Sequence, residues 1–244
     1  MKPNVLVICG PTASGKTALA VALAQRFGGE VVSADSMQIY RRMDIGTAKP
    51  TWAEMQGVPH HMLDVADPEE NYSVARYVQD AVPIVDGILA QGKLPIVAGG
   101  TGLYIDNLIA GRQFAPFTPD SGLRQSLQDR AKVEGLLALR TELERVDPDA
   151  AARIHPNDEK RTIRALEVWL STGKTITQHV RESQALPRRY APLTIALNFG
   201  ERPWLWEYID RRVDEMMERG LVDEVRRLLA DGVPPACTAM QAIG

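Results

Sequence analysis

Residues 10–17 are the feature that most constrains what this chain can fold into. They read Gly-Pro-Thr-Ala-Ser-Gly-Lys-Thr, directly after the apolar run Val5–Cys9 and directly before a helix-forming stretch. A glycine-rich loop between a strand and a helix wraps its backbone N–H groups around phosphate oxygens, and the helix dipole favours the anion. The sequence therefore predicts a site for a polyphosphate or a pyrophosphate. The alternative is a glycine turn that serves only as a bend.

Two side chains of this loop carry specific roles. We expect Lys16 to reach the terminal phosphates and the Thr17 hydroxyl to ligate Mg²⁺. The whole loop is the predicted phosphate-binding set: Gly10, Pro11, Thr12, Ala13, Ser14, Gly15, Lys16 and Thr17.

The pattern around the loop predicts an α/β fold. Helical patterns at Thr17–Phe27 and Ser73–Gln91 separate short apolar runs, and Pro83 is expected to kink or break the second helix. Alternating strands and helices are typical of a P-loop NTPase-like parallel sheet with flanking helices. The runs are Val5–Cys9, Glu30–Ala34, Leu94–Ala98 and Leu193–Leu197, with a weaker fifth at His61–Val65.

From about residue 112 to residue 190 the pattern is purely helical. Three segments there have apolar residues at helical spacing, namely Asp120–Ala131, Gly135–Val146 and Asp158–Thr172, with Asp147-Pro148 and residues 155–158 as helix stops and caps. We therefore expect a discontinuous core, 1–111 and 191–244, with an all-helical insertion at 112–190. The core should resume with a strand and one long helix, Pro203–Leu229.

Charge and cysteine content limit the function classes. The net charge of −3 does not indicate a nucleic-acid binder, but residues 153–189 carry eight Lys/Arg against four Asp/Glu, a local excess of +4. Charge alone favours an ordinary solvated helical face there. Cys9 and Cys237 match no metal spacing, which indicates reduced packing residues in the cytosol. The absence of a signal peptide and of any run of ~18 apolar residues predicts a cytoplasmic protein that does not span a membrane.

Polar groups follow two other predicted strands. Thr101 follows Gly99-Gly100, where a typical P-loop ATPase would have a carboxylate, and Asp35 follows the second strand. Asp35 would act as a general base or as an indirect Mg²⁺ ligand, unless Asp35 or Ser36 merely caps a helix. The Gln38 amide has the donor and acceptor pair that reads an adenine edge. These features fit a small-molecule kinase, with residues 153–189 as its lid, or a transferase that holds a diphosphate leaving group.

Five linked motifs then resemble the bacterial tRNA dimethylallyltransferases. They are residues 10–17, Ser-Ala-Asp-Ser-Met-Gln-Ile-Tyr at 33–40, Met-Asp-Ile-Gly-Thr-Ala-Lys-Pro at 43–50, Gly-Gly-Thr-Gly-Leu-Tyr at 99–104, and the stretch from Arg153 to Glu167. Their order and spacing agree from about residue 4 to residue 244. A phosphate loop alone is weak evidence because many NTPases have one, whereas five linked motifs are strong evidence.

The resemblance implies transfer of a dimethylallyl group from dimethylallyl diphosphate to the N6 amine of the adenosine 3′ to the anticodon, tRNA position 37. It implies that the loop and Mg²⁺ hold the diphosphate, that Asp35 accepts the amine proton, and that Thr101 positions the reactants. Arg212 resembles the family's additional diphosphate-facing arginine. The implied tRNA contacts are Asp35, Ser36, Met37, Gln38, Thr101, Glu159, Lys160, Arg161, Thr162 and Ile163.

We expect a monomer. The resemblance also implies a longer C-terminal part, since family members commonly continue with further helices. The C-terminal part of the core is therefore expected to be cut short here. Two other functions stay open at this point. A nucleotide or small-molecule kinase would form ADP from ATP, and an inactive tRNA-binding module would bind the stem-loop without forming product.

Overall fold

The computed structural model describes residues 4–112, 121–185 and 187–242. Its contacts divide the chain into two compact units, Met1–Arg112 with Arg188–Gly244, and Gln113–Pro187. We call the first unit the core and the second the insertion. Both junctions lie within three residues of the positions expected from the sequence.

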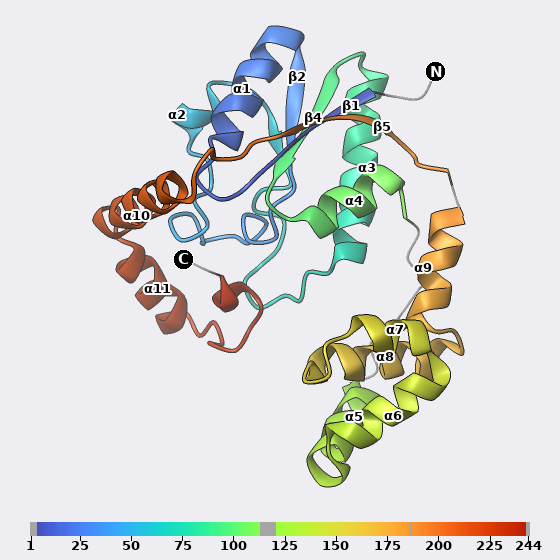
Figure 1. Cartoon of the computed structure of the whole chain (residues 1–244). Helices are drawn as coiled ribbons and strands as arrows, with labels where there is room; N and C mark the ends of the chain where they lie inside the picture. Colours follow the sequence, from blue (N-terminus) through green and yellow to red (C-terminus); the bar gives the residue numbers. More distant parts are fainter. Residues whose placement is uncertain (1–3, 113–120, 186, 243–244) are drawn as a thin grey trace. The chain divides into compact units, whose positions relative to one another are not determined.

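A five-stranded parallel sheet forms the centre of the core (Figure 1). Every predicted apolar run contributes to it, and its strand order is β3-β2-β4-β1-β5. The α/β prediction is therefore confirmed. The strands are β1 Asn4–Cys9, β2 Gly29–Ser33, β3 His60–His61, β4 Leu94–Gly99 and β5 Ala191–Ala196.

Alternating residues of the central strands pack on opposite faces of the sheet. Val5 and Val7 of β1 belong to one buried cluster and Leu6 and Ile8 to another, because successive side chains of a strand point to opposite faces. Helix α1, Lys16–Phe27, packs on the second cluster. The first cluster includes residues of α3, Val74–Ala90, and α4, Gly102–Ala110. The result is a three-layer core whose strands all end at the same edge (Figure 1).

Two helix predictions need correction. Helix α3 runs through Pro83 without interruption, so the expected break does not occur. The long helix expected over Pro203–Leu229 is two helices, α10 Arg202–Glu218 and α11 Leu221–Ala230. Gly220 separates them with a φ of 93°, a conformation that ends a right-handed helix and that glycine adopts without strain. Two short elements complete the core, α2 Trp52–Met55 and the 3₁₀ turn η1 Ala239–Gln241.

The insertion is helical throughout its described part. Its helices are α5 Ser121–Glu134, α6 Leu136–Val146, α7 Pro148–Arg153, α8 Glu159–Thr172 and α9 Ile176–Ala185. They enclose an apolar cluster of their own. The predicted segments agree with α5, α6 and α8, although Asp120 lies outside the described residues. Asp147 and Asp158 cap α7 and α8 as predicted, each accepting a bond from a backbone N–H of the first turn.

Among the helices described, none combines the length and the apolar character that crossing a membrane requires.

Candidate active site

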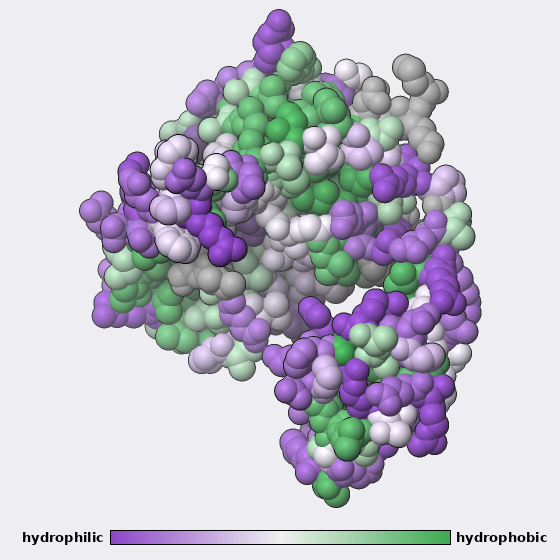
Figure 2. Space-filling view, in the orientation of Figure 1, coloured by the Kyte–Doolittle hydropathy of each residue, from purple (hydrophilic) through white to green (hydrophobic). Residues whose placement is uncertain are grey.

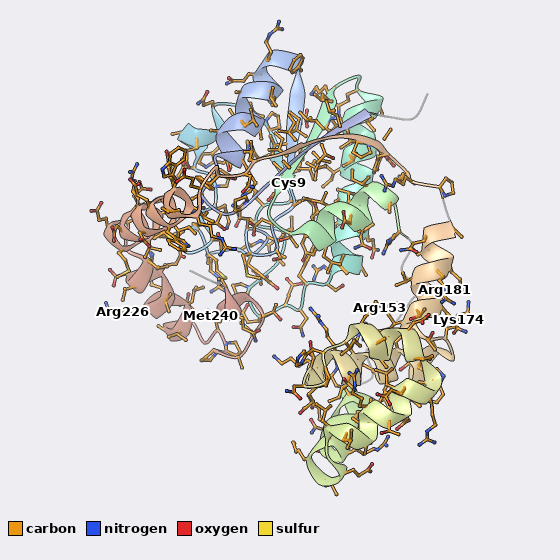
Figure 3. All side chains as sticks on the ribbon, viewed as in Figure 1. Cys9, Arg153, Lys174, Arg181, Arg226 and Met240 are labelled. Atoms are coloured by element: carbon orange, nitrogen blue, oxygen red, sulfur yellow. The ribbon has the colours of Figure 1, made fainter. Side chains whose placement is uncertain are left out.

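The phosphate loop connects β1 to the first turn of α1, and Figure 3 labels Cys9, the last residue of β1. Gly10 has a φ of 153° and Gly15 a φ of 80°, values that side chains rarely permit. A Cβ on Gly10 would lie 2.6 Å from the backbone oxygen of Leu197. The path of the loop therefore requires its first glycine sterically and its second glycine conformationally.

Lys16 lies across its own loop. Its Nζ donates to the backbone oxygens of Gly10, at 3.0 Å, and Pro11, at 2.6 Å. Burial lowers the pKa of this amine, the charge of Asp35 partly restores it, and Arg212 lowers it further. The Lys16 ammonium is thus held at the loop beside a second cation, an arrangement that an anion stabilises.

Asp35 follows β2 and closes a turn. Its Oδ1 accepts bonds from the backbone N–H groups of Met37, at 2.9 Å, and Gln38, at 3.4 Å. No helix begins within the described residues 34–38, so the helix-cap alternative for Asp35 and Ser36 is wrong. The turn holds one carboxylate oxygen and orients the other, which suits a fixed general base.

Thr101 follows β4 and joins the Asp35 segment. Its Oγ1 accepts a bond from the Ser36 N–H at 3.0 Å and donates to the Ser36 hydroxyl at 3.3 Å. The Thr101 N–H donates to the backbone oxygen of Ala34 at 3.1 Å. A Cβ on Gly99 would lie 2.1 Å from that same oxygen, so only glycine permits this approach. The two predicted catalytic residues, Asp35 and Thr101, therefore lie on loops that are bonded to each other.

Arg212 extends the site from α10. The side chain is partly buried, and burial lowers its pKa, while the charges of Asp35, Glu215 and Glu54 oppose that shift. Arg212 also acts on the pKa of Lys16, which places both cations in one electrostatic neighbourhood with Asp35. The phosphate loop, Asp35, Thr101 and Arg212 thus belong to one site at the carboxyl edge of the sheet.

The Gln38 amide is engaged inside the core. Its Nε2 donates to the backbone oxygens of Thr47, at 3.3 Å, and Ala48, at 3.2 Å, and its Oε1 accepts a bond from the Ser33 hydroxyl. These bonds occupy the groups expected to read an adenine edge. In this structure Gln38 connects the Asp35 turn to residues 43–50.

The other predicted tRNA contacts lie in the insertion, at the start of α8. Glu159, Lys160 and Arg161 are exposed, whereas Thr162 and Ile163 are buried in the helical cluster. Contact through the last two would have to use their backbone. Two basic side chains elsewhere in the insertion, both labelled in Figure 3, are partly neutralised, since Lys174 pairs with Glu182 and Arg181 with Asp149. The visible face of the insertion is mainly hydrophilic (Figure 2).

The sequence analysis did not identify two buried charged residues near the site. The Lys49 side chain is 6% exposed, and its Nζ donates to the Asp44 and Asp64 carboxylates at 2.6 and 2.5 Å. Glu224 on α11 is 5% exposed and accepts three backbone N–H groups. The signal for Glu224 was a carboxylate at an apolar position of an amphipathic helix, three residues after Leu221 and four before Leu228.

The residues present fit a Mg²⁺ ion bound together with a diphosphate. Within the described ranges no three His, Cys, Asp or Glu side chains form a metal cluster. Mg²⁺ characteristically keeps several waters and takes one or two protein oxygens together with phosphate oxygens. The Thr17 hydroxyl, in the first turn of α1, and the Asp35 carboxylate supply oxygens of that kind.

Comparison with known proteins identifies relatives over the whole chain. A family model described as IPP transferase matches residues 38–244, and one described as isopentenyl transferase matches residues 3–72. A tRNA dimethylallyltransferase of Caldanaerobacter subterraneus is 49% identical over 100% of this chain and 78% of its own length. A tRNA dimethylallyltransferase of Thermomicrobium roseum is 50% identical over 98% of this chain and 72% of its own length.

Solved structures agree with these relatives. The crystal structure of the tRNA isopentenylpyrophosphate transferase of Bacillus halodurans is 43% identical, with a TM-score of 0.69 over 100% of this chain and 75% of that one. A eukaryotic dimethylallyltransferase, captured acting on tRNA, is 32% identical, with a TM-score of 0.81 over 98% of this chain and 59% of that one. On these matches, the chain belongs to the IPP transferase family.

Proposed function

We propose that this protein is a tRNA dimethylallyltransferase. It transfers a dimethylallyl group from dimethylallyl diphosphate to the N6 amine of the adenosine 3′ to the anticodon. The names of its relatives support this activity. The observation that carries it is the geometry at the ends of β1 and β4: Cys9 lies opposite Gly99, so the phosphate loop begins beside the Thr101 segment, which is bonded to the Asp35 turn. The reaction needs such a diphosphate cradle beside a fixed base.

The leaving group is the first requirement of this chemistry. An adenine N6 amine is a weak nucleophile, since its lone pair is delocalised into the ring. The allylic C–O bond must therefore loosen early, and negative charge develops on the diphosphate. Lys16, Arg212 and the N–H groups of the loop stabilise that charge. A bound Mg²⁺, held through Thr17, would supply further charge neutralisation.

Proton removal is the second requirement. As the bond between N6 and the allylic carbon forms and the C–O bond breaks, the proton of N6 passes to Asp35 and the diphosphate leaves with its electron pair. Thr101 holds the Asp35 segment through Ser36 and so fixes where the carboxylate meets the amine. The target base must be unstacked to reach the site, which costs a few kcal/mol. An anticodon loop reduces this cost because it is already partly unstacked.

One chain would suffice for this reaction. The loop, Asp35, Thr101 and Arg212 all belong to one compact unit of a single chain, so we propose a monomer. We also propose that it acts in the cytoplasm, where its proposed tRNA substrate is found. Light scattering during gel filtration, with and without an anticodon stem-loop, tests the first proposal.

The activity is tested by incubating the protein with Mg²⁺, dimethylallyl diphosphate and an anticodon stem-loop. Mass spectrometry should find one added dimethylallyl group on the adenosine 3′ to the anticodon. A stem-loop with guanosine at that position is the control and should stay unmodified, since guanosine lacks the N6 amine. Formation of ADP from ATP by the same protein, without prenyl transfer, would contradict the proposal.

A further inference from the structure

A buried carboxylate attaches α11 to the segment after the Asp35 turn. The Glu224 Oε2 accepts the N–H groups of Asp44 and Ile45, both at 2.8 Å, and its Oε1 accepts the N–H of Gly46 at 2.9 Å. The residue is 5% exposed. A buried carboxylate is costly unless its oxygens are satisfied, and three converging N–H groups satisfy it here.

Few other buried side chains anchor the hairpin formed by α10 and α11. Met216 is the buried residue of α10, and Glu224 and Leu228 are those of α11. The ion pair between Arg42 and Asp231 is exposed on both sides and so contributes little. Among the described residues, the three bonds of Glu224 are therefore the principal polar attachment of this hairpin to the segment at residues 44–46.

The same hairpin carries Arg212. This arginine precedes the Gly220 turn on α10, and Glu224 follows it in the first turn of α11. Helix α10 begins soon after β5, whose last residue, Ala196, lies opposite Cys9 at the start of the phosphate loop. The bonds of Glu224 to residues 44–46 therefore hold the hairpin at its other end, beyond Arg212 and the Gly220 turn. Gly46 permits the close approach, since a Cβ there would lie 3.1 Å from Leu221 Cδ1 and 3.6 Å from Glu224 Oε1.

We propose that Glu224 is a positioning residue: its bonds to the N–H groups of residues 44–46 fix the α10–α11 hairpin to the core and hold Arg212 at the phosphate loop. The proposal rests on the proposed function for the diphosphate role of Arg212. It makes Glu224 a determinant of diphosphate affinity although the side chain touches no substrate.

The first test measures the attachment itself. Glu224→Gln leaves one acceptor oxygen and turns an NH₂ group toward a backbone N–H. Amide hydrogen exchange at residues 44–46 should become about tenfold faster, since charge-assisted bonds are lost. The control is Asp223→Asn, the same chemical change on an exposed neighbour in the same helical turn, which should leave this exchange unchanged.

The second test measures the effect on Arg212. With Mg²⁺ and inorganic pyrophosphate as the probe, calorimetry should find about tenfold weaker binding for Arg212→Ala and about fivefold weaker binding for Glu224→Gln. In the Arg212→Ala background, adding Glu224→Gln should change affinity by less than about twofold, because the two residues act through one interaction. If Glu224 only stabilised the fold, Glu224→Gln would weaken pyrophosphate binding by the same factor in the wild type and in Arg212→Ala.

A milder variant tests the same attachment in case Glu224→Gln does not fold. Gly46→Ala inserts a methyl group against Leu221 and should give the same pattern with smaller effects. Unchanged exchange at residues 44–46 in Glu224→Gln, or full additivity with Arg212→Ala, would overturn the proposal. Pyrophosphate binding and exchange need no prenyl transfer, so they report on Glu224 separately from the proposed activity.

Discussion

At the residue scale, the site depends on charges that the fold holds close together. Burial lowers the pKa of both Lys16 and Arg212, each partly restored by Asp35. Two cations kept partly desolvated beside a single carboxylate are unfavourable until an anion arrives. The protein therefore gives up some stability to keep a preorganised site for an anion, which we propose is a diphosphate.

The role of Asp35 is tested by Asp35→Asn. The amide can still accept the Met37 N–H and keep the turn, but it cannot take a proton. We expect kcat to fall by about 100-fold or more, while the affinity for pyrophosphate changes by a few-fold at most. Asp67→Asn, at an exposed carboxylate paired with Arg41, is the matched control and should keep wild-type turnover. Near-full turnover of Asp35→Asn would exclude the general-base role.

The lowered pKa of Lys16 predicts how stability depends on pH. Between the lowered pKa of the folded state and the ordinary value of 10.5, the unfolded chain binds more protons at this site than the folded one. The free energy of unfolding that Lys16 contributes therefore rises with pH through this interval. Urea unfolding from about pH 8 to about pH 10 should show this rise in the wild type relative to Lys16→Met. A constant difference between the two proteins would contradict the assignment.

At the scale of elements, capping carboxylates organise the insertion. Asp158 caps α8 by accepting the Arg161 N–H at 3.0 Å. Asp147 caps α7 through the Ala150 N–H at 3.1 Å, and it also accepts the Thr177 N–H in α9 at 3.0 Å. These bonds hold the pKa of Asp147 below its ordinary value against the effect of burial. One carboxylate thus joins two helices that are separate in the sequence.

Asp147 bonds two helices and Asp158 only one, so the same substitution should lower the free energy of unfolding more at Asp147. Asp158→Ala should lower the free energy of unfolding by about 1 kcal/mol, as expected for a lost cap. Asp147→Ala should cost about 2–3 kcal/mol, because it leaves buried N–H groups of two helices without an acceptor. Thermal unfolding followed by circular dichroism measures both variants. Equal losses would show that the bond to Thr177 adds no stability.

At the scale of the whole molecule, the chain combines two units with different chemistry. The core carries the phosphate loop, Asp35, Thr101 and Arg212, and the insertion carries the predicted tRNA contacts of α8. The net charge is only −3, while residues 153–189 have an excess of +4. Binding of an RNA phosphate backbone by such a surface depends on local charge, and therefore on salt.

The charge reversals Lys160→Glu and Arg161→Glu test this surface. Each should weaken binding of an anticodon stem-loop and lower the slope of log affinity against log salt by about 0.7–0.9 if one phosphate contact is lost. Lys132→Glu makes the same change of charge on α5 of the insertion, at a side chain that is 71% exposed, and should leave the slope unchanged. Fluorescence anisotropy over a salt series gives both quantities. Equal effects of all three reversals would show that only net charge matters.

Local chemistry made much of this architecture predictable. The phosphate loop, the apolar runs of the sheet and the caps at Asp147 and Asp158 depend on neighbours a few residues away, so their patterns are visible in the sequence. Two helix predictions were wrong because the effect of a single Pro or Gly inside a helical pattern was misjudged. Helix α3 continues through the exposed Pro83, with Ala81 and Val85 buried on either side of it, and a left-handed residue at Gly220 divides the long helix in two.

The amino-acid order by itself determined the strand–loop–helix unit of the phosphate site, the helical insertion and the family resemblance, because each depends on short-range pattern. Only the tertiary structure decided that Thr101 bonds the Asp35 segment, that the Gln38 amide faces inward and that Glu224 receives three N–H groups. Those contacts join residues up to 180 positions apart. No local periodicity encodes such a pairing, since it arises only when the parallel sheet brings distant loops to the same edge.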